Sequence, residues 1–452
     1  MIPEEKVVRL KEVLDKTVIR EDAVRGFEIH PMSSDLEESK QVVGVIQNAW
    51  SNNQGNPAIN FFDESDVVRG DSGVDVPATT AKLLERAELL RKKRGEKVST
   101  YFYPDFNNPF AVAQIGEYIE DFCKGDGHEH FEDLENLSFT LRTRANGHPS
   151  EIVSAVNLQL NHDNESVEWG RLVTQGGYTG HGFGRAIFEL ANDVNHFLIG
   201  YLMWSDSNTM HKTTQNLNKS VGVHAVGFSP LKFSIPNFRE FLTQTDKDGI
   251  PNAKYIYFGD GRVSTTFDMR LSRDLASKRN LATYVAQDVK PLQKLVLEKF
   301  SLAARNHNDR GGDIPSGRID PFVNQPDPIM RCLKLKSADA QSVSSVIKYV
   351  TADDPPIEYV EVDIPAIKGS VRLQEEYLKS GFFPIAYLPA FSKQGDDQRA
   401  DVVRLACLGN HDHVGEYIDL FSQGKRLEKV LIDENLGIGQ LVMSNLQRSY
   451  EQ

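Results

Sequence analysis

A glycine-rich stretch between an expected strand and an expected helix constrains the fold of this chain more than any other segment. Residues 176–185 read Gly-Gly-Tyr-Thr-Gly-His-Gly-Phe-Gly-Arg, after a strand expected over Val167–Thr174 and before a helix expected over Arg185–Val194. At a helix N-terminus several backbone N–H groups point the same way, and glycines let an anion approach them closely. The segment therefore predicts a phosphate or pyrophosphate site. Glycine content alone leaves open a turn that binds nothing.

Two common phosphate-binding loops do not fit this segment. A Walker A loop needs Gly-Lys-Ser/Thr before its helix, and none follows here. A dinucleotide-binding fingerprint opens a βαβ unit, whereas this loop comes late in its domain and no βαβ unit surrounds it.

Periodicity and turn signals predict alternating strands and helices in the first half of the chain. Ser34 with Glu37 forms a capping box, and Asn146-Gly147 marks a chain reversal. The expected strands are 27–32, 137–144, 152–160, 167–174 and 197–204, and the expected helices are 3–19, 34–50, 78–93 and 185–194. This order predicts an α/β protein with a mixed sheet of the α+β kind.

The second half echoes this strand–helix–strand–strand order. A hairpin is expected around Gly259-Asp260-Gly261, and residues 306–327, rich in Gly, Pro, Asn and Asp, predict a linker. Beyond the linker, strands are expected near 330 and over 358–364, 382–388 and 401–408, with helices within 330–350, over 373–378 and 413–423, and near the end.

Composition excludes several classes of function. The chain has 452 residues, with 51 Lys+Arg against 64 Asp+Glu, so its net charge of −13 argues against a sequence-independent nucleic-acid binder. Its longest apolar run, Phe197–Trp204, is too short to span a membrane, and its N-terminus lacks the pattern of a signal peptide. Cys123, Cys332 and Cys407 form no CxxC pair, so we expect reduced thiols and a cytoplasmic protein.

Three separate segments, taken together, resemble one family. Thr179–Gly184 is similar to the acyl-CoA-binding motif of the GNAT N-acetyltransferase superfamily, Arg/Gln-x-x-Gly-x-Gly/Ala: Gly182 and Gly184 match, and Thr179 replaces Arg or Gln. The preceding residues 168–173 look like the fourth strand of that superfamily.

The other two matches are to a bacterial subgroup of the superfamily. His211–Gln215, followed by Asn218 and Gly222, resembles the segment His-x-x-Ser/Thr-Gln…Asn…Gly-Phe of that subgroup. Its C-terminal half-domain is matched by residues 362–365, 381–383 and 401–405. The resemblance covers 26–235 and 330–410.

The resemblance implies a GNAT-like acyl-CoA N-acyltransferase domain and a second GNAT-like half-domain. The implied organisation is an N-terminal helix in 1–25, the N-acyltransferase domain in 26–235, a connecting segment with a hairpin and a linker in 236–328, and the C-terminal half-domain with terminal helices in 329–452.

The resemblance also implies an activity: transfer of an acyl group, most simply acetyl, from a coenzyme A thioester to an amine by direct attack. Amides of the loop would hold the pyrophosphate, and pantetheine would lie in a gap between the fourth and fifth strands. The implied acyl-CoA-binding residues are Val173, Thr174, Tyr178, Thr179, Gly180, His181, Gly182, Phe183, Gly184, Arg185 and Asn218.

The chemistry requires a base. An amine with a pKa of ~10.4 lies about 3.4 units above pH 7, so its neutral form costs roughly 4.6 kcal/mol unless it is deprotonated in place. Glu168, on the strand where the family often has its catalytic Glu, is the first candidate, and His211 is the second. Asn218 stands where many family members have the Tyr that protonates the thiolate, so the general acid stays unassigned, with Tyr178 or a water as guesses.

Several alternatives stay open. The chain could be a non-catalytic acyl-CoA sensor or interaction module, or could use an acyl carrier protein as donor. No metal site is expected, because the His pairs at 128/130 and 411/413 have no third ligand nearby in sequence. The acceptor would be a small-molecule or side-chain amine, with cationic amines favoured by the acidic charge. Neither nucleic acid nor membrane is expected as a partner, and the oligomeric state is left undetermined.

Overall fold

A computed structural model describes the protein. The chain divides into two compact units, Met1–Met203 and Trp204–Gln452. The described residues are 20–22, 27–32, 38, 41–42, 45, 67–69, 75–77, 136–143, 151–175, 178, 180–209, 212–234, 257–258, 262–307, 319–324, 329–335, 359–395, 397–408, 414–415, 418–419 and 427–451. The helices predicted over 3–19 and 78–93 and the His pairs lie outside them.

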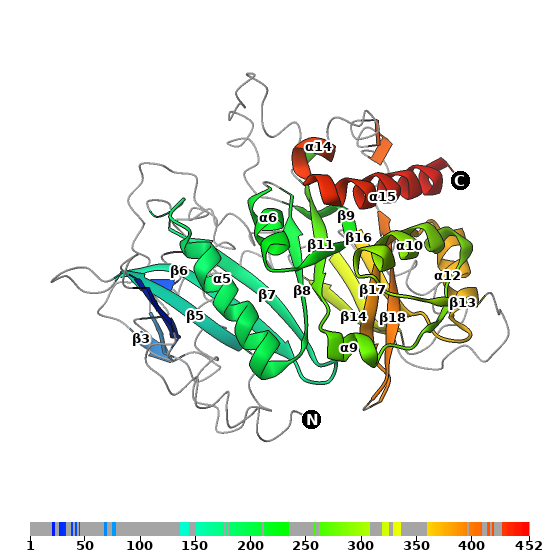
Figure 1. Cartoon of the computed structure of the whole chain (residues 1–452). Coiled ribbons are helices and arrows are strands. Elements are labelled where there is room, and N and C mark those ends of the chain that lie inside the picture. Colours follow the sequence, from blue (N-terminus) through cyan, green and yellow to red (C-terminus); the bar gives the residue numbers. More distant parts are fainter. Residues whose placement is uncertain are drawn as a thin grey trace. The chain divides into compact units, whose positions relative to one another are not determined.

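The first unit is an antiparallel sheet (Figure 1). Its strand order is β1 (Arg20–Asp22), β2 (Phe27–Pro31), β5 (Asn136–Thr143), β6 (Glu151–Asn161) and β7 (Ser166–Thr174). A separate hairpin pairs β3 (Val67–Arg69) with β4 (Asp75–Pro77). The strands predicted around Asn146-Gly147 and before the glycine segment are therefore confirmed.

Helices pack on both faces of this sheet. Helix α5 (Phe183–Val194) packs against β5, β6 and β7, as Figure 1 shows. On the other face, the helical residues Val42 and Val45 share a buried cluster with Met32, Ile152 and Val173. The amphipathic stripe predicted for 185–194 is thus confirmed, with the helix beginning two residues earlier.

The chain after α5 corrects one prediction. Residues 195–199 form a π-helix, η3 (Asn195–Ile199), and the strand β8 (Leu202–Asn208) starts only at Leu202. Gly200, with φ of 77°, ends the π-helix and donates its N–H to the Asn195 carbonyl, while Asn195 Nδ2 donates to the Tyr201 carbonyl at 3.0 Å. The apolar run 197–204 is not one strand, because these local hydrogen bonds extend the helix into it.

The second unit contains a larger sheet (Figure 1). Its strand order is β8, β11 (Arg262–Arg270), β9 (His224–Ser234), β17 (Phe383–Lys393), β18 (Arg399–Leu408), β16 (Tyr359–Pro365), β15 (Ile329–Leu335) and β14 (Ile319–Asn324), with β10 (Tyr257–Phe258) beside β11. The described pairs in this sheet are antiparallel except β15 with β16, so the sheet is mixed. The predicted mixed α/β class is confirmed.

Short elements and helices complete this unit. The helices are α6 (Thr213–Ser220), α9 (Arg273–Ser277), η4 (Gln287–Val289), α10 (Lys290–Lys299), α12 (Ser370–Lys379), α14 (Leu427–Val430) and α15 (Asp433–Glu451), and the strands β12 (Ala282–Tyr284) and β13 (Arg305–His307) pair in parallel. The segment predicted as a linker, 306–327, contains β14, because Pro321 is tolerated on a strand at the end of the sheet order.

The second unit is built from two repeats of one strand–helix–strand–strand motif. The first repeat is β8, α6, β9 and β11; the second repeat is β16, α12, β17 and β18. Their orders mirror each other in the sheet, β8–β11–β9 followed by β17–β18–β16. The echo noted in the sequence is therefore an internal pseudo-two-fold symmetry.

The repeats correspond residue by residue. In each, the two long strands pair with two register shifts that fall at matching positions. Leu231 in β9 and Ala390 in β17 both have positive φ, 54° and 52°. Each donates its N–H to the neighbouring strand, Leu231 to Ser264 Oγ at 3.1 Å and Ala390 to Asp401 Oδ1 at 2.9 Å. Leu231 is therefore the counterpart of Ala390.

The pseudo-two-fold axis passes between β9 and β17. Gly227 in β9 pairs with Ala386 in β17, and these two residues are counterparts of each other, each four positions before the residue with positive φ. A Cβ on Gly227 would lie 2.3 Å from Ala386 Cβ and 2.8 Å from the Ile385 carbonyl oxygen. Only glycine allows the two repeats to approach this closely.

Each repeat also holds a segment that follows the other repeat. Gln215 of α6 donates Nε2 to the Val430 carbonyl at 2.7 Å and accepts from the Ile432 N–H at 3.2 Å. Gln374 of α12 is its counterpart: it donates to the Tyr284 carbonyl at 3.0 Å and accepts from the Ala286 N–H at 2.8 Å. Val430–Ile432 precedes α15, and Tyr284–Ala286 precedes η4 and α10, so the helices are exchanged between the repeats.

We expect Gly227→Ala to lower the free energy of unfolding by about 1–3 kcal/mol, because the new methyl group overlaps Ala386 in a closely packed interior. The matched control is Gly170→Ala in β7, where a Cβ meets nothing within 4 Å. Chemical denaturation of both variants measures the difference. Equal stability of the two variants would contradict a close approach at the axis.

Candidate functional site

The described part of the glycine segment ends in a helix N-terminus without a side-chain cap. Gly180 and Gly182 have φ of 81° and 82°, a region that favours glycine. Gly182 is the N-cap of α5, makes no side-chain cap, and no acidic residue stands in the first turn. The first N–H groups of a helix have no partner inside it, so this end presents donors and the positive end of the helix dipole.

Aromatic side chains hold the segment against the sheet. Phe183 is buried, with its ring 5.6 Å from that of Phe27 in an edge-on contact. The His181 ring stacks on Phe183 at 5.9 Å and is exposed. Tyr178 donates its hydroxyl to Glu151 Oε2 at 2.8 Å, and this hydrogen bond raises the pKa of Tyr178. Tyr178 is thus a protonated donor already bound to a carboxylate.

Gly184 brings α5 directly onto the end of β7. A Cβ at Gly184 would lie 2.9 Å from Thr174 Oγ1. Thr174 Oγ1 is 3.0 Å from Ser154 Oγ, which donates to the Val173 carbonyl at 2.5 Å. The two glycines that match the family motif therefore have distinct roles. Gly182 adopts the positive φ of the helix N-cap, and Gly184 allows α5 to approach Thr174 closely.

A bulge in β7 decides which residues share a face. The pairs Ala155↔Val173 and Asn157↔Gly170 are separated by two residues in β6 and three in β7, so β7 contains one extra residue. Glu168 and Val173 are five residues apart and would lie on opposite faces of a regular strand. The extra residue puts both on one face.

Glu168 faces away from α5. The next residue, Trp169, packs its ring 4.3 Å from the Phe188 ring of α5, so Glu168 points to the opposite face, where Val173 joins the cluster with Met32 and Val42. Glu168 is half-buried opposite Gln159. The other candidate base, His211, and the motif residue Thr179 lie outside the described residues.

The backbone of β7 distinguishes Val173 from Thr174. The Val173 carbonyl accepts from Ser154, and the Gln175 N–H donates to the Val153 carbonyl, so both residues direct backbone groups toward β6. Neighbouring residues of a strand alternate in this direction. Thr174 therefore directs its N–H and carbonyl away from β6.

Asn218 lies in the second unit. It is buried in α6, and its Nδ2 donates to Ser207 Oγ at 2.9 Å and to Asp268 Oδ2 at 3.0 Å. Both amide hydrogens are thus used inside the protein. Asn218 Oδ1 has no hydrogen-bond partner in the part of the chain that the structure describes.

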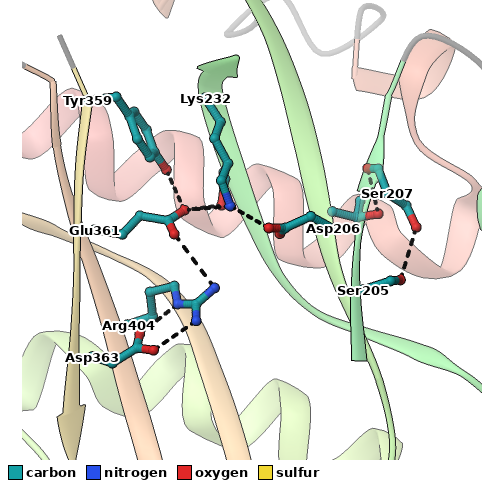
Figure 2. A network of polar contacts seen from close by, with 10 residues as sticks. Ser205, Asp206, Ser207, Lys232, Tyr359, Glu361, Asp363 and Arg404 are labelled. Atoms are coloured by element: carbon teal, nitrogen blue, oxygen red, sulfur yellow. Dashed lines mark hydrogen bonds and ion pairs between the residues drawn. The ribbon is translucent and has the colours of Figure 1, made fainter. Parts of the chain in front are cut away.

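The second unit contains a network of buried charges that no sequence pattern predicts (Figure 2). Lys232 Nζ lies 2.6 Å from Asp206 Oδ2 and 3.1 Å from Glu361 Oε1. Arg404 holds Asp363 with two hydrogen bonds, of 2.6 and 2.8 Å, and lies 3.7 Å from Glu361 Oε2. Lys232, Glu361 and Arg404 are fully buried, and pairing is what makes such burial tolerable.

Cys407 is a partly buried free cysteine. Burial raises the pKa of the Cys407 thiol to about 11, so this cysteine is inert at neutral pH. Within the described residues, no group of three or more His, Cys, Asp or Glu could hold a metal ion, and no helix is long and apolar enough to cross a membrane.

Comparisons by sequence find no match: no family model and no curated protein matches this chain. Comparisons by structure find solved acetyltransferases. A variant of spermidine N-acetyltransferase from Vibrio cholerae is 14% identical, with 42% of this chain and 89% of that chain covered and a TM-score of 0.26.

Two other solved structures give similar values. The ribosomal-protein-S18-alanine N-acetyltransferase of Escherichia coli is 15% identical, covering 34% of this chain and 79% of its own, with a TM-score of 0.23. Nourseothricin acetyltransferase is 14% identical, covering 30% and 65%, with a TM-score of 0.20. Likenesses with TM-scores below 0.5 do not assign an activity to this chain.

We expect Gly184→Ala to lower the free energy of unfolding by about 1–2 kcal/mol, because its methyl group would crowd Thr174 Oγ1. In a Thr174→Ala background the same change should be better tolerated, since the crowding atom is gone. A double-mutant cycle measured by denaturation checks this. Additive effects would show that the contact between α5 and β7 is looser than described.

Proposed function

We propose that this protein is an acyl-CoA-dependent N-acyltransferase of the GNAT type, most simply an N-acetyltransferase that uses acetyl-CoA. One observation carries the proposal: a bulged strand leads through glycines with positive φ into a helix whose N-cap, Gly182, offers no side chain to its first N–H groups. Those donors suit a pyrophosphate. The motif match of Gly182 and Gly184 agrees with this.

In this proposal the residues of the glycine segment and the end of β7 bind the donor. Amides from Tyr178 to Gly184 hold the pyrophosphate, and Arg185, an exposed cation in the first turn, adds charge. The edge of β7 at Thr174 offers backbone hydrogen bonds to the pantetheine arm. Asn218, which lies in the second unit, is assigned to a pantetheine amide by the family resemblance; its Oδ1 is buried and lacks a partner among the described residues.

The reaction would proceed by direct attack. The amine nitrogen forms a bond to the thioester carbonyl carbon, the carbon–sulfur bond breaks, and coenzyme A leaves as a thiolate that takes a proton. Glu168 or His211 receives the proton of the amine, directly or through water. Tyr178 is a poor candidate for the general acid, because its hydroxyl is already donated to Glu151 and its pKa is raised.

The acceptor class, the compartment and the domain boundaries belong to this proposal. The acceptor is a small-molecule or side-chain amine, with a cationic amine favoured by the net charge of −13. The protein acts in the cytoplasm. Residues 26–235 form the transferase domain, and 329–452 form the half-domain.

A second candidate function has one observation in its favour. Asn218 stands at the position where the family has a Tyr that acts as general acid. Both amide hydrogens of Asn218 are donated within the protein, to Ser207 and Asp268. A module that binds acyl-CoA as a sensor needs no general acid. A transferase fed by an acyl carrier protein is the remaining alternative. Release of free thiol in the presence of amines distinguishes a transferase from a sensor. Comparing acyl-CoA with an acylated carrier protein as donor identifies a transferase that uses the carrier protein.

Isothermal titration with acetyl-CoA and CoA tests the donor site. We expect saturable binding, weakened about 3- to 10-fold by Arg185→Ala through loss of a charge at the phosphates. Arg372→Ala, at an exposed arginine on α12, is the matched control and should bind as the wild type does. If millimolar CoA does not bind the wild type, the proposed function is wrong.

The base is tested by Glu168→Gln with a panel of amines. We expect turnover to fall about 100-fold and its pH profile to move to higher pH, because more of the amine must then be deprotonated by solvent. Gln159→Glu, at the residue paired with Glu168 in β6, is a control for charge at this place. An unchanged profile in Glu168→Gln would remove Glu168 from this role and leave His211.

A further inference from the structure

The first repeat contains a buried polar cluster at positions where the second repeat has apolar groups. Asp268 in β11 is completely buried, and its Oδ2 accepts from Asn218 Nδ2 at 3.0 Å and from Thr266 Oγ1 at 2.9 Å. Ser207 of β8 also hydrogen-bonds to this carboxylate, and its Oγ accepts from Asn218. The cluster joins β8, α6 and β11.

The second repeat fills the same positions with apolar groups. Asp268 pairs with Ala225 and Leu405 with Pro384, at matching distances from the axis, so Leu405 is the counterpart of Asp268. By the same registers, Val403 is the counterpart of Thr266.

The other two counterparts follow from main-chain hydrogen bonds. The Asn218 carbonyl accepts from the N–H five residues on, as the Tyr377 carbonyl does in α12. Thr209 N–H donates to the Ser264 carbonyl just as Ala366 N–H donates to the Asp401 carbonyl, which makes Ile364 the counterpart of Ser207. Ile364, Tyr377 and Leu405 are all buried.

The fold therefore does not need the polar cluster. A buried carboxylate whose hydrogen-bond partners among the described residues are all neutral is unfavourable relative to the apolar packing that the same chain uses at the counterpart positions. Its donors are neutral groups, and the cation that acts on it is Lys299 of α10. Lys299 in turn lies near Lys219 of α6 and Glu434 of α15, and Glu434 contacts Lys219 at 2.9 Å and His224 of β9 at 3.5 Å.

We propose that Asp268 is a positioning residue that binds a proton: its ionised carboxylate orients the Asn218 amide and connects α6 to β8 and β11, and protonation weakens its hold on the Asn218 amide. Asn218 and Thr266 both donate to Oδ2, so a proton on Oδ1 leaves these two hydrogen bonds in place but removes the charge that strengthens them. The Asn218 orientation matters because it leaves Oδ1 as the acceptor assigned to the acyl donor; this step rests on the proposed function.

Asp268 titrates in a pH range in which the protein can be studied. Burial raises the pKa of Asp268 from 3.8 to about 6, against the opposing effects of its three hydrogen bonds and Lys299. A raised pKa means that the folded protein binds this proton more tightly than the unfolded chain. Its contribution to stability is therefore fully present below pH 3.8 and is lost as the pH rises through about 6.

The first arm of the test measures stability against pH by denaturation. Relative to Asp268→Asn, the wild type should gain about 100-fold in its folding equilibrium constant between pH 7.5 and pH 4. Thr266→Val introduces the side chain found at the counterpart Val403 and removes one donor to the carboxylate. The pH at which stability changes should therefore move higher. This variant keeps the test decisive if Asp268→Asn does not fold. Identical pH dependence in the wild type and both variants would overturn proton binding at Asp268.

The second arm titrates CoA into the wild type and Thr266→Val at several pH values. We expect the affinity of the wild type to fall below about pH 6 and the fall to begin at higher pH in Thr266→Val. An affinity profile that is the same in both proteins would overturn the positioning role. If the wild type binds no CoA at any pH, the proposed function fails and the positioning role with it, while the stability arm still decides proton binding.

Discussion

The contact of Gly227 with Ala386 is the constraint on which the second unit depends. It lies where β9 meets β17, and a side chain at residue 227 would overlap both the Ala386 methyl group and the backbone. Because the two residues are counterparts, the local symmetry of the sheet passes through this pair. Each repeat then receives the helix that follows the other repeat, held by Gln215 or Gln374. The close approach at the axis lets the two symmetric repeats share one sheet.

Side chains break this symmetry where the repeats differ in chemistry. Near the axis, Arg404 lies 4.3 Å from the Phe267 ring, and these two residues are counterparts. Phe267 stacks on Trp204, whereas Arg404 binds Asp363 and lies near Glu361. The same backbone thus supports an aromatic contact on one side and buried ion pairs on the other. Burying paired charges is tolerated in place of apolar packing and favours one specific pairing of the repeats.

The glycine segment shows how much of the candidate site is local in sequence. Strand β7, the glycines and α5 are consecutive, so periodicity, glycine content and a helix start predict them together, and the structure confirms these elements. The bulge in β7 could not be predicted, because it depends on the register with β6. That bulge, rather than alternation along the strand, puts Glu168 and Val173 on one face. The expected strand over 197–204 was wrong for a similar reason: hydrogen bonds of Asn195 and Gly200 compete with the apolar pattern.

The sequence by itself determined the strands and helices around the glycine segment, the mixed α/β class, the glycine segment at a helix N-terminus, and the echo between the two halves. These depend on side-chain periodicity and on residues close together in the chain. Only the tertiary structure decided that the echo is a two-fold repeat with exchanged helices, that Asn218 donates to Asp268, and that Lys232 meets Glu361. Such contacts join residues 50 or more positions apart. They depend on strand register, which no local pattern contains.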